Sequence, residues 1–139
     1  MEVLSRGANF EITADGDLCR CTVVNSAGVD KEEGARCAQQ MRETLLFRVL
    51  TPLSLYRALV FDVTRGPEVF GPVTREMLEG IFRAAEHSKR RLAVRISGAA
   101  MQRLQFSSLC RDSAPTQGKV VESDDQEKDW ARNRPSGAP

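Results

Sequence analysis

Residues 61 to 78, FDVTRGPEVFGPVTREML, hold the acid and the hydroxyl that are best placed to do chemistry. Asp62 lies where an apolar run ends, and Thr74 lies where a helical pattern begins. Ligands of open α/β sheets bind at the carboxyl ends of strands, so Asp62 could act as an acid, a base or a ligand. Local spacing places no second carboxylate or histidine beside it. We therefore favour a structural role, in which Asp62 accepts hydrogen bonds from the backbone of the following loop.

Thr74 could carry a phosphate group, because a helix N-terminus stabilises negative charge. The alternative is a surface threonine in the first helical turn. The preceding segment, TRGPEVFGP, holds two glycines but neither GxGxxG nor GxxxxGK[ST], so it predicts a loop shaped by glycine and proline. Phe70 in this loop either docks a partner or packs over the start of the helix.

Thiols and the imidazole are the other reactive groups. Cys19, Cys21, Cys37 and Cys110 lack the paired short spacings of zinc modules, and the first two share one face of a predicted strand. We expect that face to be buried, the cysteines to be reduced core residues, and no metal site. The only histidine, His87, lies near a predicted helix end, where no pattern places a nucleophile beside it. The sequence therefore predicts no catalytic residue and no enzyme.

The composition restricts the class of partner. The 139 residues include 20 Lys and Arg against 19 Asp and Glu, and the net charge of +1 gives no global attraction to nucleic acid. Lys89, Arg90 and Arg91 could form a small basic patch with Arg95, but we interpret the three consecutive charges as a solvated turn; binding of an anionic headgroup or an acidic partner helix is the alternative. No apolar run has the roughly 18–20 residues of a membrane span, and MEVLSRGANFEI lacks a secretory signal pattern. We expect a cytoplasmic protein without a cofactor.

Apolar periodicity predicts the elements that position these groups. Asp15-Gly16 is a hairpin signal between two alternating segments, and the continuous apolar run from Ala58 to Phe61 predicts a central strand covered on both faces. Strands are expected at 9–13, 17–24, 56–63, 91–96 and 118–123.

Helix signals separate the later strands. Asp30, Ser97 and Ser123 are predicted N-caps, and Pro72 suits the first turn of the helix that carries Thr74. The order β-β-α-β-α-β-α-β-α predicts an α/β fold: a mixed, mostly parallel five-stranded sheet with an N-terminal hairpin and about four helices. We expect a single domain over residues 1–132 and a disordered tail over 133–139.

This pattern resembles the STAS-like domains, meaning the sulphate-transporter and anti-sigma-antagonist fold and its lipid-transfer-like bacterial relatives. The resemblance covers about residues 9–132 and lies in the order of the apolar segments rather than in fixed chemistry. The segments that carry it are EITADGDLCRCTVV, YRALVFDV, VTREMLEGIFRAAEHSKRR, LAVRISGAAMQRLQFSSL and KVVESDDQEKDW.

The chain departs from that family at its regulatory position. In anti-sigma factor antagonists, a phosphorylatable serine before a glycine starts the second long helix. The matching stretch here reads Gly71, Pro72, Val73, Thr74, and the serine position falls near Pro72 or Val73. Neither can be phosphorylated, and Thr74 is the nearest hydroxyl. The resemblance therefore implies no switch at the usual serine and leaves Thr74 as the candidate phosphosite.

Our leading hypothesis is a non-enzymatic regulatory module that binds another protein. The resemblance implies an anti-sigma-type kinase or another signalling protein as the partner. The partner surface is expected on the loop 64–71 and the first turns of the following helix. The candidate partner-binding residues are Asp62, Thr64, Arg65, Phe70, Val73 and Thr74.

Two alternatives come from other classes of function. The lipid-transfer-like resemblance allows an apolar small molecule or lipid, bound between the sheet and the helices that carry Met41 and Met77. The other alternative is a self-associating scaffold, such as a homodimer, because one apolar segment is wider than a single helix face needs. That segment contains Leu46, Phe47, Val49, Leu50 and Leu53.

Overall fold

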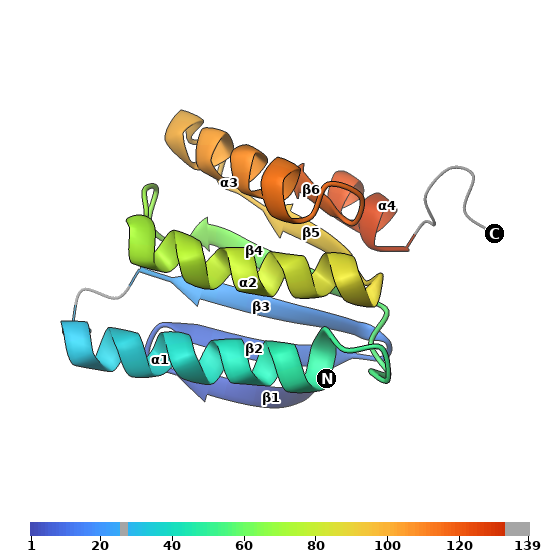
Figure 1. Cartoon of the computed structure of the whole chain (residues 1–139), viewed down its shortest axis with the longest axis horizontal. Helices are drawn as coiled ribbons and strands as arrows, with labels where there is room; N and C mark the ends of the chain where they lie inside the picture. The colour runs from blue at the N-terminus through green and yellow to red at the C-terminus, as the bar shows by residue number, and fades with distance from the viewer. Residues whose placement is uncertain (26–27, 133–139) are drawn as a thin grey trace.

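A mixed six-stranded sheet with strand order β1-β2-β3-β4-β5-β6 forms the centre of the protein (Figure 1). The computed structural model describes residues 1–25 and 28–132, and over these ranges the sheet carries four α-helices and one π-helical turn, η1. The predicted α/β class is confirmed. In chain order the elements are β1 Glu2–Gly7, β2 Phe10–Asp15, β3 Leu18–Val24, α1 Lys31–Thr44, η1 Leu45–Val49, β4 Ala58–Arg65, α2 Pro72–Ser88, β5 Arg91–Arg95, α3 Ala100–Ser113, β6 Gly118–Val121 and α4 Asp124–Arg132.

The strand that the sequence did not predict is β1, which pairs antiparallel with β2 at the edge of the sheet. The expected count of five strands is therefore one too low. The segment EVLSRG shows no alternation, because a shift of register between Val3 and Ser5 puts one residue out of step. Val3 is also exposed, as an edge strand allows.

The remaining strands follow the expected topology. Gly16, with a φ of 63°, makes the tight turn between β2 and β3, which are antiparallel. β3, β4, β5 and β6 pair in parallel, so their carboxyl ends share one edge of the sheet. The predicted loop 64–71 leaves the sheet from that edge, although its first two residues, Thr64 and Arg65, form the end of β4.

The two faces of the sheet carry different cores. Figure 1 shows α1, α2 and α3 side by side over one face, where they cover the larger apolar cluster. On the other face α4 packs over β4, β5 and β6, where Val60, Ala93 and Val121 form a small cluster. Leu59 and Phe61 are buried at 0% and 1% exposure, so the expectation of a covered central strand is confirmed.

Local sequence signals predicted most of the helix starts correctly. The Asp30 carboxylate accepts a hydrogen bond from the Glu33 N–H at 2.8 Å, and Pro72 is the first residue of α2. The Ser123 hydroxyl accepts one from the Gln126 N–H at 3.2 Å, just before α4. These three predictions are confirmed, because each signal acts within one turn of chain.

Ser97 does not cap α3, contrary to the prediction. The helix begins at Ala100 with Ala99 as its N-cap residue, and Gly98 at a φ of 97° turns the chain before it. The Ser97 N–H and hydroxyl instead contact the Gln102 side chain. The Ser97 hydroxyl accepts from the Ala99 N–H at 3.3 Å, ahead of the helix, and donates to Gln102, so it accepts from no N–H of the helix itself.

The helix that follows the hairpin ends in an unexpected form: α1 passes directly into the π-helical turn η1 before the loop that contains Pro52. None of the helices in the part of the chain that the structure describes is long and apolar enough to cross a membrane. The tail predicted at 133–139 lies outside the described residues.

Candidate functional site

An apolar pocket of about 70 Å³ lies at the carboxyl edge of the sheet, beneath the loop 64–71. Side chains from two strands, three helices and the loop converge on it, and Thr74 is the only polar residue among them. The lining residues are Val23, Met41, Phe61, Val63, Pro67, Phe70, Thr74, Met77, Leu78 and Phe106.

Strand alternation and helical spacing produce this convergence. Phe61 and Val63 point to the helix-covered face of β4, because successive side chains of a strand point to opposite faces. The ring of Phe106, from α3, lies 6.4 Å from that of Phe61 and 5.2 Å from that of Phe70, in tilted geometry. The pocket floor is therefore a packed aromatic cluster, and Phe70 closes it from the loop.

Two glutamines of α3 hold the loop over the pocket. The Gln102 side chain is 0% exposed, and its Nε2 donates to the carbonyls of Val63 at 2.8 Å and Pro67 at 3.4 Å. The Gln105 amide accepts from the Phe70 N–H at 3.1 Å and donates to the Phe70 carbonyl at 3.3 Å. Sequence reasoning missed Gln102. The one sign of this role in the sequence is that Gln102 is a polar residue within the apolar stripe of a helix.

Two of the six predicted partner-binding residues, Phe70 and Thr74, line this pocket, and a third, Val73, is the chain neighbour of Thr74. Phe70 is half-buried, as packing over the helix start requires, and Thr74 is exposed at the rim. Val73, beside it in the first turn of α2, is 81% exposed. The structure thus brings Phe70, Val73 and Thr74 together at the carboxyl edge of the sheet.

The other three predicted residues face elsewhere. Asp62 is only 8% exposed, and its Oδ1 accepts from the Thr64 N–H at 2.9 Å and the Thr64 hydroxyl at 2.7 Å. This is the structural role that the sequence favoured. Arg65 is exposed and lines a separate hollow of about 240 Å³ that includes Arg6 and Glu11. Asp62, Thr64 and Arg65 therefore do not share the surface around the pocket.

Asp62 belongs instead to an ion-pair network under α4, which sequence reasoning also missed. Arg20 of β3 donates to Asp62 at 2.5 Å and to Glu127 of α4 at 3.0 Å. Arg95 of β5 donates to the same Glu127 at 3.3 Å and to Asp124 at 2.7 Å. The partners are far apart in the chain, so no local spacing could reveal them.

The pKa shifts of Asp62 and Arg20 favour the charged forms of both side chains. Burial alone would raise the pKa of Asp62, but hydrogen bonds from Thr64 and Arg20 outweigh it and hold that pKa below its ordinary value. Burial opposes the charge on Arg20, yet Glu127 and Asp62 raise its pKa above the usual range. The arrangement is a structural clamp, without a group poised to transfer a proton.

The predicted basic group does not form one solvated turn. Side chains alternate along β5, so Arg91 and Arg95 point under α4, where the Arg91 guanidinium lies 3.8 Å from the centre of the Trp130 ring. Arg91 is 7% exposed. Lys89 and Arg90 precede the strand and remain on the outside of the sheet edge. The interpretation of the three consecutive charges as a solvated turn is therefore wrong for Arg91.

The thiols are core residues, as expected. All four cysteines are free and buried. Burial raises the pKa of Cys19 and of Cys110 to about 12 and raises that of Cys21 as well, so these groups stay protonated and unreactive at neutral pH. Over residues 1–25 and 28–132, no three His, Cys, Asp or Glu side chains converge in a way that could hold a metal ion.

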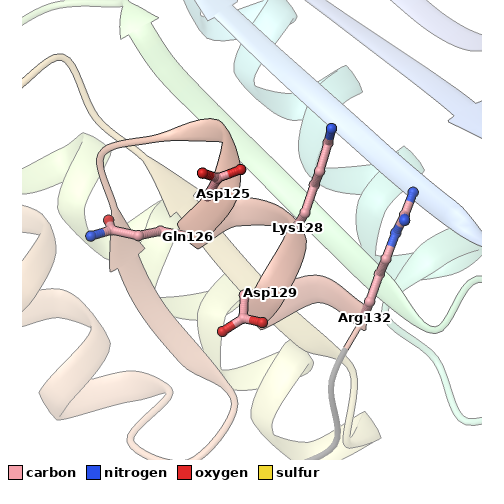
Figure 2. A pocket seen from close by; sticks show the side chains of 5 residues that line it. All are labelled: Asp125, Gln126, Lys128, Asp129 and Arg132. Carbon is pink, nitrogen blue, oxygen red and sulfur yellow. The ribbon is translucent and has the colours of Figure 1, made fainter.

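A shallow hollow of about 480 Å³ lies on the solvent side of α4 and does not have the shape of a ligand site. Figure 2 shows that its five lining side chains, Asp125, Gln126, Lys128, Asp129 and Arg132, all project from this one helix. Lys128 and Arg132 point to one side, away from Gln126 and Asp129. Ligand sites are concave and mostly apolar, with groups that converge from several elements. The smaller apolar pocket meets that description better.

Comparisons of the chain with family models, with curated proteins and with solved structures find no match.

Proposed function

We propose that the chain is a non-enzymatic, STAS-like regulatory module, whose apolar pocket receives one bulky apolar side chain of a partner protein. The observation that carries this proposal is the pocket itself: a preformed apolar cavity at the carboxyl edge of the sheet, closed by the loop 64–71. Protein interfaces concentrate their binding energy in a few anchor side chains that fill such pockets.

The volume of the pocket favours a protein partner over a small-molecule ligand. Met41 and Met77 line the pocket, and the sequence offered an apolar ligand between their helices and the sheet as an alternative to a protein partner. Ligand pockets usually measure roughly 300–1,000 Å³, whereas this one holds about 70 Å³. A space of that size fits one side chain and is too small for a lipid or a drug-sized molecule. We therefore favour the protein partner.

The surroundings of the pocket suit such an anchor. Val69 and Val73 are 55% and 81% exposed, and both belong to the segments that carry the pocket rim. Around an anchor pocket, apolar rim contacts exclude water and so strengthen the central interaction. Gln102 and Gln105 fix the loop in place, so little ordering entropy is lost when a partner binds.

Thr74 gives this surface a means of regulation. Its side chain lines the pocket, and α2 has no side-chain cap at its N-terminus. A phosphate on Thr74 would be stabilised by the free N–H groups of the first turn, and it would place charge where the apolar anchor enters. We expect Thr74→Glu to weaken partner binding, while Thr74→Ser should leave it nearly unchanged.

Site-specific photo-crosslinking in the native cell tests the proposal. A benzophenone amino acid is placed at Val69 or Val73, and matched control proteins carry it at His87 or Arg111, which are exposed on other surfaces. We expect one regulatory protein to be crosslinked at positions 69 and 73 and not at the controls. Introducing Thr74→Trp, which covers the pocket mouth, should abolish that adduct. Equal adducts at all four positions, or an adduct that Thr74→Trp leaves intact, would count against the pocket.

A further inference from the structure

The end of the sheet opposite the pocket, where the parallel strands begin, carries a second apolar surface. Phe47 at the end of η1, and Leu53 and Leu55 in the loop before β4, are 77%, 92% and 88% exposed. Val49 and Leu50, which the sequence grouped with them, are buried at 1% and 4% and belong to the core. The exposed apolar area is therefore a set of separate projecting side chains and not one continuous helix face.

Three cations lie at the same edge. Arg48 follows Phe47 and donates from Nη1 to the Leu4 carbonyl of β1 at 3.3 Å, and Arg90 donates from Nη2 to the carbonyls of Thr51, Pro52 and Ser54 at 3.2, 2.9 and 3.2 Å. Lys89 precedes Arg90 at the end of α2, which Figure 1 shows beside the loop that follows η1. Within the described ranges, none of these three cations has a carboxylate partner. We call Phe47, Leu53, Leu55, Arg48, Lys89 and Arg90 the basal surface.

We propose that the basal surface docks on an anionic lipid bilayer. Large apolar side chains insert into the interfacial region of a membrane, and nearby Lys and Arg residues are attracted by acidic headgroups. The basal surface offers both features at one edge of the molecule. It lies at the opposite end of the sheet from the apolar pocket, so membrane docking would leave the loop 64–71 accessible to a protein partner (Figure 1).

Several backbone groups of the loop before β4 have hydrogen-bond partners within the protein, so they do not depend on water. Unsatisfied carbonyl groups are costly to move from water into an apolar environment. Here Arg90 satisfies three of them, and the Ser54 hydroxyl donates to the Arg48 carbonyl at 3.2 Å and accepts from the Tyr56 N–H at 3.0 Å. Insertion of Leu53 and Leu55 would therefore expose few unpaired polar groups.

Charge argues against the other occupants of this surface. In a symmetric pair of chains, Arg48, Lys89 and Arg90 would face their own copies, and like charges across an interface are unfavourable. An acidic protein would match the charge, but it would also have to supply a shaped pocket for each of the projecting side chains Leu53 and Leu55. A fluid lipid interface accommodates projecting side chains without a shaped pocket.

Co-sedimentation with vesicles tests the proposal. The full chain is mixed with phosphatidylcholine vesicles that contain or lack phosphatidylserine. We expect binding to the acidic vesicles only, and weaker binding at high salt. The pair Leu53→Ser and Leu55→Ser should lower the partition coefficient by at least about tenfold. The pair Arg48→Gln and Lys89→Gln should lower it by about fivefold for each cation removed.

The controls separate docking from misfolding and from other partners. Leu104→Ser removes a leucine that is 66% exposed on α3, remote from the basal surface, and should bind vesicles like wild type. Thermal unfolding followed by circular dichroism should be the same for all variants. Absence of binding to acidic vesicles, or unchanged binding by the Leu53 and Leu55 pair, overturns the proposal. So does a dimer that the leucine pair dissolves without any vesicle binding, or full competition by an acidic polypeptide.

Discussion

Gln102→Ala is the substitution that most sharply tests how the loop over the pocket is held. The Gln102 amide is fully buried and bonds to the Val63 carbonyl at 2.8 Å, the Pro67 carbonyl at 3.4 Å, the Ser97 N–H at 2.8 Å and the Ser97 hydroxyl at 3.1 Å. Each such bond contributes about 1 kcal/mol net, and a buried carbonyl left unpaired costs about 1–3 kcal/mol. We expect the free energy of unfolding to fall by about 3–4 kcal/mol.

Urea unfolding followed by circular dichroism measures this loss. For a protein of this size, a slope of about 2 kcal/mol/M converts the loss into a fall of about 1.5–2 M in the midpoint. Gln105→Ala is the matched control, because it removes only two bonds, to Phe70 at 3.1 and 3.3 Å, at a half-buried position where water can replace part of them, and it should cost about 1 kcal/mol. A Gln102→Ala midpoint within experimental error of the Gln105→Ala midpoint would refute the assignment of Gln102 as the main anchor.

Two further predictions concern stability. The folded-state pKa of Asp62 is lowered, so its ionised form stabilises the fold above about pH 4, and this contribution is lost as the pH falls below about 4 towards the folded value. Asp62→Asn should therefore flatten the fall of Tm over that acidic range, and an unchanged slope would contradict the clamp with Arg20. Gly80→Ala in α2, where a Cβ meets nothing within 4 Å, should add about 0.5–1 kcal/mol to the free energy of unfolding. Gly118→Ala should lower it by about 1–3 kcal/mol, because the new Cβ lies 2.9 Å from Ala114; a urea midpoint below wild type for Gly80→Ala, or at or above wild type for Gly118→Ala, would refute the corresponding assignment.

The sequence predicted the elements whose signals are local. Asp30 and Pro72 marked helix starts, and Gly16 marked the hairpin, because each acts within a few residues. The segment that became β1 was missed, since its pairing with β2 and its bulge after Val3 depend on the rest of the sheet. Ser97 was assigned wrongly, because its contacts with the buried Gln102 amide, which fix it ahead of the helix, became visible only in three dimensions.

The candidate site, too, was predictable only where its signals are local. The loop 64–71 and Phe70 were singled out from turn residues and an apolar side chain, and both lie at the pocket. Asp62 was also singled out, but its side chain points to the other face of the sheet and contacts Arg20. The network that includes Glu127 joins β3 to α4 over more than a hundred residues of chain, so spacing along the sequence carries no trace of it.

Methyl spectra of the methionines test the central claim most directly. The chain has four methionines; Met41 and Met77 line the pocket, and Met1, at the N-terminus, does not. A protein labelled at the methionine methyl groups is titrated with the partner that is crosslinked at position 73. We predict that the Met41 and Met77 signals shift together and saturate at equal concentrations of the two proteins, while the Met1 signal stays in place. Saturable binding that leaves both pocket methionines unshifted would show that the pocket is not where the partner binds.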